Sequence, residues 1–235
     1  MITRVGNDTL RFERGPWIAG WASSVGKREK EGPLGDLFDQ CHEDTLLGAD
    51  SWEQAESRLQ AEASLLALRK AGMEPEELDC VFAGDLLNQC AASVFGLRKL
   101  DVPYLGQYGA CSTMAQTIAT ASVFVESGAA QRALAVTSSH FCSAERQFRL
   151  PLEYGGQRTP TAQWTATASG AVILSAEPPA GAVRAVAVRE ATFGRMVDLG
   201  VTDAANMGAA MAPAACRTLV NYFADTGLTP EAFDL

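Results

Sequence analysis

The chain has 235 residues, of which 47% are hydrophobic and 20% charged, so it can bury a substantial core in one large or two small domains. Its formal net charge of −9 argues against nucleic acid as the main partner, because an acidic surface is repelled by a phosphate backbone. The cysteines form no CxxC pair, so we expect no metal site and reduced thiols, as in a protein folded inside the cell.

The first fifty residues are rich in glycine, proline and charge, and we expect most of them to form loops. The segment "GWASSVGKREKEGPLGDLFD" (20–39) is typical of a solvated connection, although long irregular segments also supply lids and binding loops. Residues 52–71 then show the three-and-four apolar spacing of an amphipathic helix. That helix is expected to begin after Ser51, in a capping box with Gln54, and to end at Gly72.

Strands and helices alternate along the rest of the chain. The segment "YLGQYGACS" is expected to form a strand, a tight turn and the start of a helix that runs to about Ser127, and a second long helix is expected at 207–226. Further strands are expected in "LDCVFAG", "RALAVTSSH", "TASGAVILSA" and "AVRAVAVREATF", the last two as a pair. This alternation predicts an α/β/α sandwich around a mixed, mainly parallel sheet. In such sheets the site lies beyond the carboxyl ends of the strands, which here points to Asp85–Gln89, the turn at Cys111 and Ser138–His140.

Cys111 lies where a strand, a tight turn and a helix rich in small residues follow one another. The free N–H groups at the start of a helix favour a thiolate, and a sharp turn lifts the side chain out of the sheet, as acyl transfer through a thioester requires. The alternative is a small buried residue in a helix that tolerates nothing larger. The spacing alone leaves both interpretations open.

An internal similarity links residues 71–85 with residues 226–235. Both segments run from a long helix through glycine and Pro-Glu to an acidic residue that opens a strand. We therefore expect residues 1–225 to form the first half of a duplicated fold and residues 226–235 to begin a second half that is cut short. Chance similarity over ten residues is the alternative.

The motifs around Cys111 resemble the thiolase and ketoacyl-synthase superfamily. Closer still, five segments are similar to the stage V sporulation protein AD family over roughly residues 17–235: "KREKEGPLGDLFD", "AGDLLNQ", "YGACST", "TSSHFCSAERQFRLPLEYGGQ" and "DLGVTDAANMGAAMAPAA". The resemblance implies a thiolase fold and a noncatalytic protein that binds dipicolinic acid, the pyridine dicarboxylate that spores accumulate with calcium. It also implies a place in the forespore or spore, peripheral to the inner membrane, with other spore membrane transport proteins as partners.

The sequence itself contains no stretch typical of a signal peptide and no run of about 18 apolar residues that would span a membrane. Two other functions stay open beside ligand binding. One is an acyltransferase or condensing enzyme with Cys111 as its nucleophile, although the second-half His or Asn of such enzymes is absent here. The other is a dimeric scaffold, because superfamily members pair through the strand after the cysteine helix, here Arg132–Ser139, and we expect a homo-oligomer.

The candidate ligand contacts are Asp85, Asn88, Gln89, Cys111, His140, Arg146 and Tyr154. The guanidinium of Arg146 matches a carboxylate in a bidentate fashion. Asp85 and Asn88 suit a pyridine nitrogen, a water or calcium, or they cap the following helix instead. His140 either donates to a carboxylate or is hydrogen-bonded within the fold, and Tyr154 offers an aromatic wall. No resident cofactor is expected, with calcium only as a companion of the ligand.

Overall fold

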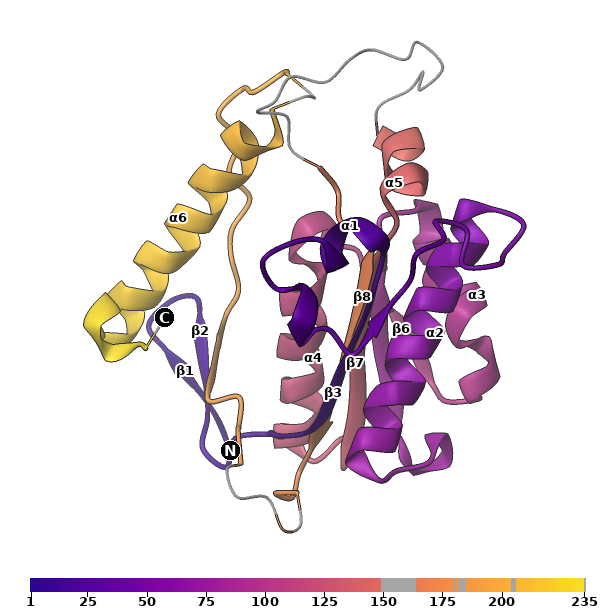
Figure 1. The fold of residues 1–235 in the computed structure, drawn as a ribbon. Helices are drawn as coiled ribbons and strands as arrows, with labels where there is room; N and C mark the ends of the chain where they lie inside the picture. Colours follow the sequence, from indigo (N-terminus) through magenta and orange to yellow (C-terminus); the bar gives the residue numbers. More distant parts are fainter. Residues whose placement is uncertain (149–163, 180, 182–184, 204–205, 235) are drawn as a thin grey trace.

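A computed structural model describes residues 1–148, 164–179, 181, 185–203 and 206–234, and its main body is a six-stranded sheet (Figure 1). The strands lie in the order β4-β3-β8-β7-β5-β6. Their bounds are β3 Trp17–Val25, β4 Gln40–Cys41, β5 Cys80–Gly84, β6 Tyr104–Gly106, β7 Arg132–Ser139 and β8 Ala168–Ser175. β7, β5 and β6 run parallel, as do β3 and β4, while β8 is antiparallel to both of its neighbours. The sheet is therefore mixed and mainly parallel, as predicted.

Helices cover both faces of this sheet (Figure 1). Their bounds are α1 Lys27–Lys30, α2 Trp52–Ala71, α3 Ala91–Leu97, α4 Thr113–Ser127 and α5 Phe141–Phe148. Because side chains alternate along a strand, Val81 of β5 packs in the cluster under α2, whereas Phe82 packs in the cluster under α4. The two apolar clusters and the sheet between them form the expected α/β/α sandwich.

The limits of α2 follow from its capping residues. The Ser51 side chain accepts a hydrogen bond from the Gln54 N–H at 3.3 Å, and the Gln54 side chain accepts one from the N–H of Asp50. Gly72 ends the helix in the left-handed conformation, with φ of 66°. The helix predicted at residues 52–71 is confirmed.

A second, smaller sheet contains β1 (Ile2–Val5), β2 (Thr9–Phe12) and β9 (Glu190–Thr192), all antiparallel. The long helix α6 (Met207–Thr226) lies beside it (Figure 1). The carboxylate of Asp225 accepts hydrogen bonds from the N–H groups of Asn7 and Asp8, each at 2.9 Å. It thereby ties the end of α6 to the turn between β1 and β2. Among the described residues, no helix has the length and apolar character that a membrane crossing requires.

The similarity between the two helix ends extends to their conformation. α6 ends at Gly227 with φ of 71°, as α2 does at Gly72. Each is followed by a short 3-10 helix that begins with proline, at Pro75–Glu77 and Pro230–Ala232. The division of the chain at residue 225 stays a prediction.

The expectation that residues 1–50 are mostly loop is wrong for β1, β2 and β3. β3 contains the glycine and serine residues of "GWASSV", which resembled a solvated connection. A side chain at Gly20 would come within 2.7 Å of the Ala67 carbonyl oxygen, so this glycine permits close packing of α2 on the sheet. The small residues of this segment allow another element to pack closely on a strand. The same residue types are typical of turns, so composition alone does not distinguish the two.

Two expectations about strand partners are also wrong. β8 and β9 do not form a pair, because β8 lies inside the large sheet and β9 pairs with β2 in the small one. Arg132–Ser139 (β7) is hydrogen-bonded to β5 on one side and β8 on the other, so it has no free edge through which two copies could pair. The homo-oligomer itself stays a prediction.

Candidate functional site

A pocket of about 760 Å³ opens where β5 and β7 end. Its lining includes Asp85, Cys111, Ser138 and Ser139, so residues from the three predicted strand-end segments gather in one place. The start of α6 adds Met207, and residues near the beginning of β8 add a further wall. The pocket therefore lies at the strand ends to which the sequence points.

Cys111 lies in the turn Ala110–Ser112, directly before α4 and in the same pocket as Asp85. The hydroxyl of Thr113 donates to the Ala110 carbonyl at 2.7 Å and accepts from the Gly109 N–H at 3.1 Å, which fastens the turn. The predicted position at the helix N-terminus is confirmed. Because Cys111 is exposed, the alternative of a small buried residue is wrong.

Asp85 is buried, and both of its carboxylate oxygens are engaged by the protein. One oxygen accepts from the Leu87 N–H at 2.9 Å, and the other accepts from the N–H and hydroxyl of Ser93 at 2.8 and 2.6 Å. Ser93 lies in the first turn of α3, so Asp85 performs the helix-capping role that was one of its two interpretations. Its side chain still lines the pocket.

Asn88 and Gln89 follow Asp85 but do not line this pocket. Both are exposed. Gln89 and Cys90 adopt left-handed backbone conformations, with φ of 60° and 52°. These two candidate contacts are therefore separated from the residues that meet at Cys111.

His140 is buried behind the end of β7 and also lies outside the pocket lining. Its Nε2 donates to the Thr45 carbonyl oxygen at 2.7 Å, and its Nδ1 accepts from the Cys142 N–H at 3.2 Å. Burial lowers the pKa of this imidazole. The structure thus shows the internal hydrogen bonding that was the alternative to a ligand contact.

Arg146 points to the start of α2. Its guanidinium pairs with the Glu53 carboxylate and lies 5.1 Å from the centre of the Trp52 ring. It does not line the pocket. Tyr154 lies outside the described residues.

Glu56 is a buried carboxylate behind the pocket, and it was not among the predicted site residues. The hydroxyls of Ser138 and Ser143 donate to it at 3.2 and 2.7 Å. Burial raises its pKa to about 7, the serine hydroxyls oppose this shift, and the nearby charge of Asp85 adds to it. A carboxylate on the buried face of the predicted helix 52–71 was the signal that would have identified it.

The rim of the pocket contains an aromatic and cationic stack. Trp164 lines the pocket and is stacked on Phe141, with ring centres 4.7 Å apart. The Arg28 guanidinium lies 4.0 Å from the centre of the Trp164 ring. The neighbouring Glu29 carboxylate accepts from the Thr167 N–H at 3.0 Å and so holds α1 against this wall. Neither Arg28 nor Trp164 was among the predicted site residues.

The described lining is acidic in character. Its ionisable groups are Asp85, Cys111 and Glu145, and within the described part of the pocket no lysine, arginine or histidine joins them. Arg28 is the cation that reaches the rim, through its contact with Trp164. Among the described residues, Arg28 is therefore the cation placed to balance the charge of an anionic ligand in this pocket.

Comparison with solved structures shows a thiolase-like fold. OleA from Xanthomonas campestris bound with cerulenin is 18% identical, with a TM-score of 0.63 over 95% of this chain and 74% of that one. The 3-oxoacyl-(acyl carrier protein) synthase III FabH from Xanthomonas oryzae pv. oryzae is 15% identical, with a TM-score of 0.60 over 100% of this chain and 77% of that one. At these identities the likeness concerns the fold alone.

Comparison of sequences gives a closer relationship. The stage V sporulation protein AD of Bacillus subtilis (strain 168) is 44% identical over 230 residues, which are 98% of this chain and 67% of the relative. The family model for stage V sporulation protein AD (SpoVAD) matches residues 6–235. The chain therefore belongs to the stage V sporulation protein AD family.

Proposed function

We propose that this sporulation protein binds dipicolinic acid in the pocket at Cys111 and supports its uptake into, or release from, bacterial spores. The observation that carries the proposal is the pocket, in which residues from several strand ends come together. The chain belongs to the stage V sporulation protein AD family, which is the reason for choosing this ligand. Its volume of about 760 Å³ suits a small ligand. The protein would act in the forespore or spore, peripheral to the inner membrane, with membrane transport proteins as partners.

The charge of the pocket favours a ligand that arrives with calcium. Dipicolinate carries two carboxylates, and the buried carboxylate of Asp85 in the lining would repel a bare dianion. A bound Ca²⁺ neutralises the dianion and is chelated by hard oxygen donors, which the ligand itself supplies. We therefore expect the calcium complex to bind more tightly than the free acid.

An acyltransferase that uses Cys111 is the second candidate, because this thiol is exposed in the pocket of a thiolase-like fold. A condensing reaction also needs an acid–base partner near the thiol. His140 is hydrogen-bonded to the Thr45 carbonyl, and His42 is hydrogen-bonded to Glu62. Neither histidine lines the pocket. The pocket itself supports ligand binding, whereas an acyltransferase would also need an acid–base partner that neither histidine provides.

Calorimetric titration of the protein with dipicolinate, with and without calcium, tests the proposal. We expect binding that calcium strengthens about tenfold or more, and weaker binding of isophthalate, which lacks the pyridine nitrogen. Cys111→Ala should retain most of the affinity. Absence of binding in both conditions would refute the proposal, whereas an acyl adduct on Cys111 after exposure to acyl-thioesters would support the acyltransferase.

Arg28→Gln is expected to weaken dipicolinate binding about tenfold, because the variant loses the cation that reaches the pocket rim over Trp164. Arg28→Lys should keep part of the affinity, since it retains the charge but not the planar fork. Arg146→Gln is the matched control, because that guanidinium pairs with Glu53 outside the pocket. Equal losses in the Arg28 and Arg146 variants would show that only the overall charge matters.

A further inference from the structure

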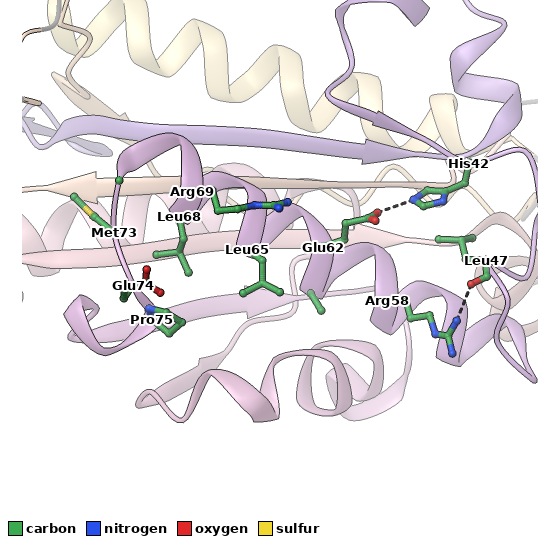
Figure 2. Close-up of a pocket in the computed structure, with 12 residues that line it drawn as sticks. His42, Leu47, Arg58, Glu62, Leu65, Leu68, Arg69, Met73, Glu74 and Pro75 are labelled. Atoms are coloured by element: carbon green, nitrogen blue, oxygen red, sulfur yellow. Dashed lines mark hydrogen bonds and ion pairs between the residues drawn. The ribbon is translucent and has the colours of Figure 1, made fainter.

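A second hollow, of about 950 Å³, runs along the outer side of α2 and shares no lining residue with the pocket at Cys111 (Figure 2). Arg58, Ala61, Leu65, Leu68 and Gly72 follow one another along it at spacings of three and four residues. The segment after β4 closes one end, and the turn after α2 closes the other. This is the α2 groove.

The centre of the α2 groove is apolar. Leu65 is 45% exposed, Leu68 forms a buried floor, and Ala61, one turn before Leu65, is small and half-buried. An alternating three-and-four spacing is the seam pattern by which one helix packs along another. The outer side of α2 is therefore shaped to receive a second helix.

The charges along the α2 groove leave two arginines available. Glu62 is engaged by the His42 Nε2 at 2.6 Å and by the Ser24 hydroxyl at 2.5 Å (Figure 2). Arg58 donates only to a backbone carbonyl, that of Leu47, at 2.8 Å. The Arg69 guanidinium makes no hydrogen bond or ion pair with any residue that the structure describes.

Glu74, at the far end of the groove, caps the 3-10 turn that follows α2. Arg58 and Arg69 are eleven residues apart on the helix, or about 16 Å along its axis, one on each side of Leu65. We propose that the α2 groove binds an amphipathic helix of a partner protein, with apolar residues over Leu65 and acidic residues opposite Arg58 and Arg69. This interaction surface is independent of ligand binding at Cys111.

The same charges argue against the two other occupants of such a surface. In a two-fold antiparallel pair of α2 helices whose symmetry axis lies midway between the two arginines, Arg58 of each copy would face Arg69 of the other, and like charges in that position repel. An anionic membrane surface attracts clusters of several lysines and arginines, whereas the α2 groove has two arginines together with Glu62 and Glu74. An acidic helix satisfies both arginines and covers the exposed leucine.

The test uses a fluorescent synthetic helix of about 18 residues, with leucine at heptad positions a and d and glutamate at e and g. We expect it to bind the protein by anisotropy, and a matched peptide with lysine at e and g to bind at least tenfold more weakly. The double variant R58E/R69E should lose about tenfold or more in affinity for the glutamate peptide. Arg217→Glu, an exposed change on α6, should not affect it.

Several results would overturn the proposal. One is that the glutamate peptide does not bind, or binds R58E/R69E as well as the wild type. Another is concentration-dependent self-association, measured by light scattering, that Leu65→Asp abolishes, because the groove would then pair two copies. A third is cosedimentation with phosphatidylglycerol vesicles that depends on Arg58 and Arg69. Far-UV circular dichroism of each variant verifies that α2 remains folded.

Discussion

Asp85→Ala is expected to lower the free energy of unfolding by about 3–5 kcal/mol. The carboxylate is buried and accepts three hydrogen bonds, two from N–H groups and one from the Ser93 hydroxyl. Alanine would leave these donors without their acceptor, and it would free the start of α3. Urea denaturation at neutral pH measures the effect as a lower midpoint at an unchanged slope.

Two further variants separate the structural role of Asp85 from a direct contact with ligand. Asp85→Asn keeps one acceptor oxygen, so it should cost less stability than alanine. Asp36→Ala, at an exposed position in the loop before β4, should change the free energy of unfolding by less than about 0.5 kcal/mol. If Asp85→Asn abolishes dipicolinate binding while leaving stability unchanged, the carboxylate contacts the ligand and its capping bonds are secondary.

The parts of the fold that were predicted correctly are those encoded by neighbouring residues. Ser51 and Gly72 fix the ends of α2 through contacts within one turn, and Gly227 ends α6 in the same way. β3 was missed because the reason for Gly20 lies far along the chain, at the Ala67 carbonyl. A sequence pattern reports local preference, whereas close packing of distant elements appears only in the fold.

The candidate site shows the same difference between features set by local sequence and features set by distant contacts. Asp85, Cys111 and Ser138 were brought together by a rule about where parallel strands end, and the pocket contains them. Arg146 was selected for its chemistry, but its orientation depends on Glu53, a partner that no spacing indicated. Arg28 and Trp164 meet because α1 and the segment before β8 come together at one rim, which the spacing of residues within either segment does not reveal.

Glu56 is expected to make stability depend on pH in the direction opposite to an ordinary carboxylate. Its pKa is about 7 in the folded protein, against 4.5 as the ordinary value, so between these pH values the folded state holds a proton that the unfolded chain has released. The stabilisation is fully present below pH 4.5 and is lost as the pH rises through 7. The corresponding change in the free energy of unfolding is about 3 kcal/mol.

Glu56→Gln removes this titration while keeping the size of the side chain and one acceptor oxygen. The difference in free energy of unfolding between wild type and variant, measured in urea from about pH 4.5 to 8, should therefore shift toward the variant as the pH rises. A difference that stays constant over this range would mean that Glu56 titrates at its ordinary pKa. Because Ser138 and Ser143 bind this carboxylate from β7 and α5, which both contribute to the pocket, a change in its protonation should also alter hydrogen exchange in α5.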